Sequence, residues 1–431
     1  MKRTTPTTLI RSVAVVAALG LVAVACGDDD DDAGSTDAPT TTEAGSDTTT
    51  AGTDTTDAGS DTTEAGSDTT DAGSDTTEAT PGTGGNGAGA GDLSACPDPL
   101  VVQTDWFPEA EHGALYHLIG DDYSVDSNDK VVSGPLLAGG EDSGLTLEVR
   151  SGGPAIGDQP VSVQQYADDS ITLGYATTEA QVLRYEDNAV ISVIAPLEIN
   201  PQIIYWDPET YPEIETLADL GEEGVTINVF GGGTFSDVFV AQGIWSADQV
   251  DPSYDGSPAR FIAEDGKIAQ QGFASAEPFK YEHEFTDWGK PIAYQLLHDA
   301  GFQVYSQTLS VRPDMLEDLS PCLAAFVPLV QQAAVDYLEA PERANAMIID
   351  AVEQFDTFWT YNEALAEYSV QTQKELGLVG NGADDTLGNM EAERIQDAID
   401  QIRDAGLDVP DDLEASDLFT NEFIDESIGV R

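Results

Sequence analysis

The sequence predicts an α/β fold made of two lobes, and three observations lead to this prediction. The 337 residues from Ala95 to Arg431 exceed the size at which one hydrophobic core usually divides into two. Short apolar runs alternate with amphipathic stretches, as in a sheet covered by helices. Some runs, such as 189–195, are apolar almost without interruption, which is typical of strands buried on both faces.

The first 26 residues predict export and a lipid anchor. Lys2, Arg3 and Arg11 lead into an apolar run that is too short to span a membrane and ends in small residues. The segment 21–26, Leu-Val-Ala-Val-Ala-Cys, resembles a bacterial lipobox, in which Cys26 becomes the first mature residue and carries a diacylglyceryl group. An ordinary signal peptide cut near Ala25 is the alternative.

Residues 26–94 predict a disordered acidic stalk. The segment consists mainly of Asp, Thr, Ser, Ala and Gly, and a unit Ala-Gly-Ser-Asp-Thr-Thr-Glu/Asp repeats from Ala44 to Glu78. Because apolar residues do not recur at regular spacing, the segment cannot bury enough surface to offset its conformational entropy. We expect it to hold the folded part near a membrane.

The folded part is predicted to begin with strands and to end with helices. After the strands, apolar residues recur at helical spacing in 323–338, 348–359 and 395–402, and we interpret these stripes as packing faces rather than binding grooves. The apolar runs that predict strands are 100–104, 145–150, 171–175, 189–195, 202–206, 225–230, 272–276 and 302–311.

Cys96 and Cys322 are the two thiols that remain after Cys26. In an exported protein a pair of cysteines is more often bridged than free, so the sequence predicts a disulfide between them. Such a bridge would place the start of the folded part beside the start of a helix near the end of the chain. Two separate buried thiols are the alternative.

The net charge of −64 excludes a nucleic-acid binder, because affinity for phosphates comes mainly from Lys and Arg. A charge of −50 falls on Ala95–Arg431, so the folded part is itself strongly acidic. Self-repulsion favours a soluble monomer, and the field attracts cations and repels anions.

One segment resembles a known family. Residues 104–116, Thr-Asp-Trp-Phe-Pro-Glu-Ala-Glu-His-Gly-Ala-Leu-Tyr, are similar to the opening of the SsuA/THI5-like (NMT1-like) family. Weaker matches are Leu-Gly-Tyr-Ala-Thr-Thr-Glu at 173–179 and Gly-Phe-Ala-Ser-Ala-Glu-Pro at 272–278, so the resemblance covers about residues 100–331. It implies a type II periplasmic-binding-protein fold, with two α/β lobes and a two-strand hinge, that serves an ABC importer. The family's solutes include thiamine-precursor pyrimidines, sulfonates and nitrate, and the acidic balance disfavours the two anions.

The resembling segment supplies the first candidate ligand-binding residues. Trp106 follows a strand, at the edge where open α/β sheets bind ligands, and its ring could stack on a planar solute. Glu111 could pair with an amino group, and His112 could exchange hydrogen bonds with a heteroaromatic solute. A core aromatic, and an acid that merely suits a helix start, are the alternatives.

Further candidates follow other predicted strands. Helix starts and glycine loops offer free backbone amides, although the glycine loop is equally compatible with a simple tight turn, and no Gly-Lys-Ser/Thr follows to make it a nucleotide loop. Glu277 could bind a cationic or amino group at a strand end. The candidates after strands are Tyr175, Thr177, Thr178, Gly232, Gly233, Thr234 and Glu277, with Asn200 and Tyr281 as lower-grade additions.

No catalytic, metal or cofactor motif stands out. The sequence has no nucleophile elbow, no His-Glu-x-x-His and no Cys-x-x-Cys, and its four His are scattered. We therefore expect no enzyme and no cofactor. The alternatives are a hydrolytic or pyrimidine-metabolising enzyme on the same fold and a stalked surface-interaction module.

The sequence thus predicts a lipid-anchored receptor on the outer face of the cell membrane. It would capture a small polar solute, of a thiamine-precursor-like pyrimidine or related nitrogen-compound type, between two lobes, and deliver it to an ABC permease and its ATPase. The expected parts are a signal peptide at 1–25, the stalk at 26–94, a first lobe at 95–195 and 305–431 that includes the C-terminal helices, and a second lobe at 196–304.

Overall fold

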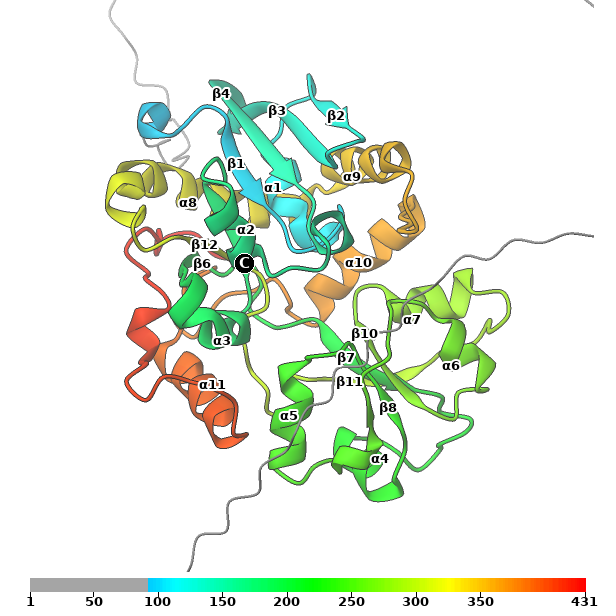
Figure 1. Ribbon diagram of the computed structural model, residues 1–431. Helices are drawn as coiled ribbons and strands as arrows, with labels where there is room; N and C mark the ends of the chain where they lie inside the picture. The colour runs from blue at the N-terminus through cyan, green and yellow to red at the C-terminus, as the bar shows by residue number, and fades with distance from the viewer. Residues whose placement is uncertain (1–91) are drawn as a thin grey trace, which may run out of the picture. The chain divides into compact units, whose positions relative to one another are not determined.

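The computed structural model describes residues 92–431, and in this part of the chain the strands form two sheets. The first is seven-stranded, in the order β2-β3-β4-β1-β5-β12-β6, and the second is five-stranded, in the order β11-β7-β10-β8-β9 (Figure 1). The predicted signal peptide, Cys26 and nearly all of the predicted stalk lie outside the described residues.

The first sheet is built around a short, fully buried parallel strand. All four residues of β1 are buried, and β1 pairs in parallel with β4 on one side and with β5 on the other. β12 runs antiparallel between β5 and β6. The strands of this sheet are β1 (Leu100–Gln103), β2 (Ser124–Asp126), β3 (Val131–Ala138), β4 (Glu141–Arg150), β5 (Leu173–Ala176), β6 (Ile191–Ile194) and β12 (Thr308–Val311).

The second sheet has mixed pairing. β10 is parallel to β8 and antiparallel to β7, and β7 also pairs with β11. β7, which lies between β11 and β10, is apolar and almost wholly buried, as expected for a strand covered on both faces. The strands are β7 (Gln202–Trp206), β8 (Ile227–Asn228), β9 (Val250–Asp251), β10 (Ala269–Phe273) and β11 (Ala293–Leu296).

The chain crosses between the sheets twice, through 195–201 and through 297–307. The first crossing leads from β6 to β7, and the second from β11 to β12. The expected α/β class, with two lobes joined by two crossing segments, is confirmed by this topology. From here on, the first lobe means the elements packed on the first sheet, and the second lobe those packed on the second sheet.

Helices cover both sheets. The helix α11 packs against α3 and α5, so its apolar stripe Ile395, Ile399 and Ile402 lies in a hydrophobic cluster that also contains Val182 of α3 and Val238 of α5. The helices are α1 (Gly113–His117), α2 (Val161–Ala167), α3 (Thr178–Asn188), α4 (Leu217–Glu223), α5 (Thr234–Ala241), α6 (Ala259–Ala263), α7 (Glu277–Phe279), α8 (Leu316–Glu339), α9 (Glu342–Phe355), α10 (Glu363–Glu375) and α11 (Ala392–Asp404). Shorter single turns are η1 (Leu93–Ala95), η2 (Ala110–His112), η3 (Gly153–Ile156), η4 (Ala247–Gln249), η5 (Lys280–Glu284) and η6 (Ala415–Asp417).

A disulfide joins Cys96, which follows η1, to Cys322 in α8, and the two Cα atoms are 4.6 Å apart. Among the described residues, α8 is the helix that is long and apolar enough to cross a membrane. Its residues Leu323, Phe326 and Val330 are fully buried in the core of the first lobe. The length and composition of α8 are therefore those of a central packing helix.

Several predicted strands have different bounds in the structure. The predicted strand 302–311 is wrong before Thr308, because residues up to 307 cross between the sheets and have no strand beside them. The predicted strand 272–276 is displaced: β10 covers Ala269–Phe273, and the chain then turns into α7. The strands β2, β3, β9 and β11 were not predicted, and the predicted helical stripe 348–359 ends at Phe355, so Trp359 lies in a loop.

Candidate functional site

A cavity of about 150 Å³ lies where residues of both sheets meet. The first lobe contributes the turn that follows β1, and the second lobe contributes the ends of β7, β8 and β10. Because the walls come from both lobes, a solute in the cavity would contact both. The lining residues are Asp105, Trp106, Glu109, Glu111, Gln202, Phe230, Tyr254, Gly256, Gln271, Gly272, Phe273, Ala276, Glu277, Gln307 and Trp359.

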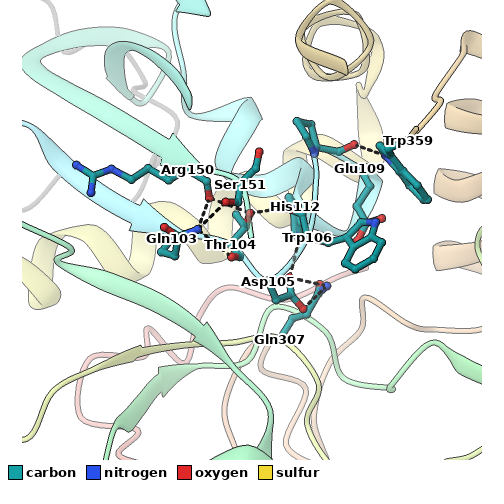
Figure 2. Close-up of polar contacts among 11 residues, drawn as sticks. Gln103, Thr104, Asp105, Trp106, Glu109, His112, Arg150, Ser151, Gln307 and Trp359 are labelled. Atoms are coloured by element: carbon teal, nitrogen blue, oxygen red, sulfur yellow. Dashed lines mark hydrogen bonds and ion pairs between the residues drawn. The ribbon is translucent and has the colours of Figure 1, made fainter. Parts of the chain in front are cut away.

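The turn after β1 is held by polar contacts to the end of β4 (Figure 2). The Gln103 side-chain amide donates to the carbonyl of Ser151 at 2.9 Å, and the Thr104 hydroxyl lies 2.8 Å from the Trp106 carbonyl. At Gly152 a Cβ atom would lie 2.1 Å from the Thr104 carbonyl, so no other residue fits here. These contacts fix Asp105 and Trp106 at the edge of the sheet.

Trp106 belongs to an aromatic cluster at the cavity. Its ring meets those of Phe107, Phe358 and Trp359 edge to face, at centroid distances of 6.1, 6.5 and 6.0 Å. The Trp359 indole N–H donates to the Pro108 carbonyl at 3.2 Å, which ties the loop after α9 to the turn after β1. The two indoles thus form a rigid apolar wall of the kind that binds planar groups.

Asp105 connects the cavity to the interior of the first lobe. Its carboxylate accepts a hydrogen bond from Nε2 of His112 at 2.9 Å, and from the Gln307 amide at 3.2 Å (Figure 2). His112 is fully buried and stacks on Tyr175, with ring centroids 5.3 Å apart. Neither His112 nor Tyr175 is among the residues that line the cavity, and His112 holds Asp105 from behind.

Three glutamates lie around the cavity in addition to Asp105. Burial is the main cause that raises the pKa of Glu109, Glu111 and Glu277, and neighbouring carboxylates raise the pKa of Glu109 further. Glu111 accepts a hydrogen bond from the Ser275 hydroxyl, which joins the two lobes. No Lys, Arg or His is among the residues that line the cavity.

Contacts with neighbouring residues of the chain direct the Glu277 carboxylate toward the cavity. Its Oε2 accepts a hydrogen bond from the backbone N–H of Phe273 at 2.6 Å. Its side chain lies over Gly272, where a Cβ atom would come within 2.7 Å of the Glu277 Cγ. The glycine at 272 is therefore part of what allows this carboxylate to fold back toward the cavity.

Two further hollows adjoin the cavity and share wall residues with it. One, of about 400 Å³, shares Tyr254, Glu277 and Trp359 with the cavity and reaches Lys280 and Tyr281. The other, of about 520 Å³, shares Gln202, Phe230 and Gln271 with the cavity. It is lined by the glycine loop and by the start of α3. The cavity and these two adjoining hollows are together called the cleft below.

The structure brings some of the predicted ligand-binding residues to this cleft. Trp106, Glu111 and Glu277 line the central cavity. Thr177, Gly232, Gly233 and Thr234 line one neighbouring hollow, and Tyr281 lines the other.

Other predicted site residues lie outside the lining. In addition to His112 and Tyr175, these are Thr178 and Asn200, which hold the crossing segments. The Thr178 hydroxyl accepts a hydrogen bond from the Tyr305 N–H at 3.1 Å, and Asn200 accepts one from the Gln202 N–H at 3.0 Å. Their polar atoms are used in shaping the hinge region rather than offered to the cleft.

Sequence reasoning missed much of the cavity wall. Asp105 and Glu109 stand in the same segment as Trp106, so their position after a strand was an available signal. Gln307 falls in a predicted strand and Trp359 in a predicted helix, so neither residue was considered as part of a binding site. Phe230, Tyr254 and Gln271 reach the cavity through the tertiary fold alone. Within 92–431, no group of three or more His, Cys, Asp or Glu side chains is placed to hold a metal ion.

Comparison with known proteins finds solved structures of low sequence identity. No protein-family model matches the sequence, and no curated protein matches it. Solved structures that match include the aliphatic sulphonate-binding protein SsuA of Escherichia coli, at 14% identity over 74% of this chain and 91% of that chain, with a TM-score of 0.47. The ligand-binding component of an ABC-type import system of Staphylococcus aureus matches at 12% identity over 75% of this chain and 97% of that chain, with a TM-score of 0.48. The nitrate-binding protein NrtA of Synechocystis matches at 10% identity over 76% of this chain and 88% of that chain, with a TM-score of 0.47.

Proposed function

We propose that this protein is the extracytoplasmic solute-binding component of an ABC importer, and that it captures a small polar solute between its two lobes. The observation that carries the proposal is the cavity itself, whose wall combines Trp106 and Asp105 of the first lobe with Phe230, Gln271 and Glu277 of the second. A solute that contacts both lobes stabilises the closed arrangement relative to the open one. A permease can distinguish the two arrangements.

The cavity chemistry suits a planar, nitrogen-containing solute such as a heteroaromatic ring. The Trp106 and Trp359 indoles meet at 6.0 Å and present apolar surface, while carboxylates and amides supply hydrogen-bond acceptors. The resemblance to the SsuA/THI5-like family, in the segment that contains Trp106, points to the same class of protein. Binding at Trp106 is the part of the proposal that a single substitution can test.

The test is a thermal-shift screen of pyrimidines, amines, vitamins and sulfonates on the full chain. A ligand at about 100 times its dissociation constant stabilises the folded protein by about 2.7 kcal/mol, which is readily measured. Trp106→Ala should abolish the shift without changing the melting temperature of the free protein by a comparable amount. Tyr166→Ala, which removes an aromatic ring outside the cleft, is the matched control and should keep the shift. Turnover of a bound compound, or no shift with any class, would contradict the proposal.

We also propose the cellular arrangement that the N-terminal sequence predicts. Residues 1–25 are removed, Cys26 carries the lipid, and 26–94 tethers a monomeric body made of a first lobe, 95–195 with 305–431, and a second lobe, 196–304. The permease and its ATPase then receive the solute at the membrane surface. The mass of the N-terminal peptide of the native protein is the measurement, and an unmodified Cys26 or an uncleaved Met1 would contradict the anchor.

A further inference from the structure

The charged groups that line the central cavity indicate which chemical class of solute it can bind. Four carboxyl groups line it, those of Asp105, Glu109, Glu111 and Glu277, and no cationic side chain does. Lys280 lies next to it, but its ammonium is 4.3 Å from the centroid of the Trp359 ring and forms no ion pair within 4 Å in the described part of the chain. Lys280 acts on Glu109 and Glu277 through its charge from beyond ion-pair distance, and His112 binds Asp105, so the four carboxyl groups outnumber the basic side chains beside them.

A second, independent feature of the cavity points to a ligand. Gln307 lines the cavity and is only 4% exposed. Its amide nitrogen donates to Asp105, but its Oε1 atom has no hydrogen-bond partner among the described residues. A buried carbonyl oxygen without a donor is costly, so this atom fits a ligand that brings an N–H group.

Building on the solute-binding role, we propose that the solute is a small organic cation whose charged group carries N–H donors, such as a protonated amine or amidine on a planar body. The planar body lies against the Trp106 and Trp359 indoles. The charged group lies among the carboxylates and donates to Oε1 of Gln307. A cavity of about 150 Å³ is of the size that accepts one six-membered ring.

The contacts of each carboxylate support separate roles. Glu111 already accepts a hydrogen bond from the Ser275 hydroxyl. Asp105 already accepts hydrogen bonds from His112 and Gln307. Glu277 uses only Oε2, for the Phe273 N–H, and no hydrogen bond occupies Glu109 in the described residues. Glu109 has both oxygens left to accept from the cation, and Glu277, whose other oxygen is held by a backbone N–H, has Oε1.

The experiment compares benzamidine with its neutral isostere benzamide, using isothermal titration calorimetry on the full chain. Benzamidine should bind at least about tenfold more tightly, because the two molecules share shape and differ in charge. Benzoate should not bind measurably. Benzyltrimethylammonium, a cation without N–H groups, should bind more weakly than benzylamine, because it cannot donate to Gln307.

Two isosteric substitutions locate the effect. Glu277→Gln and Glu109→Gln should each weaken benzamidine binding by about tenfold or more and leave benzamide binding unchanged. Glu282→Gln removes the same charge from an exposed position next to the cleft and should leave both affinities unchanged. Melting of each free variant shows that it is folded.

The pH dependence of benzamidine binding distinguishes a role of the Glu109 charge from a purely structural role of this side chain. Burial and the neighbouring carboxylates raise the pKa of Glu109, so the free protein holds protons that a bound cation would displace. Benzamidine affinity should therefore increase from about pH 5.5 to about pH 8, and Glu109→Gln should flatten the increase. The ionisable groups that face Glu109 are Asp105, Glu111, His112, Tyr116, Tyr175, Glu277, Lys280 and Tyr361.

The outcomes separate this inference from the function on which it rests. Equal or tighter binding of benzamide or benzoate, or no binding of any amine or amidine, overturns the cation proposal. Binding of Mn²⁺ alone that Glu277→Gln abolishes, without benzamidine binding, overturns it as well. In each case a neutral or anionic solute that raises the melting temperature through Trp106 would leave the solute-binding function standing. Failure of every solute class would remove both.

Discussion

Buried carboxyl groups make the stability of this protein depend on pH in an unusual direction. A carboxyl group whose pKa is higher in the folded than in the unfolded state binds more protons when folded. Stability then falls as pH rises from the unfolded pKa to the folded one. Glu109, Glu111 and Glu277 belong to this group, and burial raises the pKa of Glu179 to about 7. The free protein should be more stable near pH 5 than near pH 8.

Glu179→Gln tests this at one position. Glu179 lies in the first turn of α3 at the edge of the cleft, and burial is the largest cause of its raised pKa. The variant should be more stable than the natural chain by about 1 kcal/mol near pH 8, since one unit of pKa corresponds to about 1.4 kcal/mol and solvent screens part of the effect. Near pH 4.5 the two should be equally stable. Urea unfolding at both pH values is the measurement.

Thr177 and the backbone N–H of Glu179 act in the opposite direction, lowering the pKa of the carboxyl group. If those contacts dominated, the natural chain would be the more stable one near pH 8. Glu186→Gln, at an exposed position on the same helix, is the control and should change stability little at either pH.

At the residue scale the sequence predicted the edge of the sheet but not the direction of each side chain. Trp106 and Glu111 line the cavity, whereas His112 is buried in the core, where its Nε2 donates a hydrogen bond to Asp105. The position of a residue directly after a strand indicates at which edge of the sheet that residue lies. It does not tell which residue of a turn accepts a buried partner, and the contact between His112 and Tyr175 requires the folded sheet.

At the scale of elements, strands buried on both faces were the most predictable. β1 and β7 coincide closely with predicted apolar runs. β3 was missed because Gly134 and Pro135 interrupt its pattern, and only pairing with the long β4 makes the segment a strand. Residues 302–307 are apolar enough to suggest a strand, but a strand also needs a neighbour.

The link between η1 and α8 gives the element-scale prediction. Cys96 and Cys322 are 226 residues apart in sequence, so their disulfide removes much conformational freedom from the unfolded chain. Replacing both by Ser should lower the free energy of unfolding by about 2–5 kcal/mol. Neither residue lines the cleft, so the benzamidine affinity of the folded variant should be unchanged.

Urea unfolding of the double variant and of the natural chain gives the stability difference, and calorimetry gives the affinity. Reduction of the natural chain should produce the same loss of stability as the double substitution. A loss below about 1 kcal/mol would mean that the link adds little to the packing of η1 on α8.

At the scale of the whole molecule, the two sheets are held together on one side by more than the crossing segments. The Ser369 hydroxyl donates to the Ser275 carbonyl at 2.7 Å, and the Tyr368 hydroxyl donates to the Ala274 carbonyl at 3.2 Å. α10 of the first lobe is thereby attached to the turn after β10 in the second. The alternation of strands and helices predicted two lobes, but this attachment joins residues about 94 positions apart, which no local pattern indicates.

The charge of the whole molecule predicts how fast a cation reaches the cleft. The net charge is −64, and a strongly acidic protein raises the local concentration of cations around it. The association rate of benzamidine should therefore fall several-fold between about 20 mM and about 500 mM NaCl, because salt shortens the range of the field. The dissociation rate should change much less, since the contacts among buried carboxylates are less screened than the long-range field. Stopped-flow fluorescence of the indoles at the cavity measures both rates, and benzamide, which carries no charge, is the control whose association rate should not depend on salt. An association rate of benzamidine that is equally independent of salt would mean that the acidic surface does not direct cations to the cleft, whatever the affinity of the cavity for them.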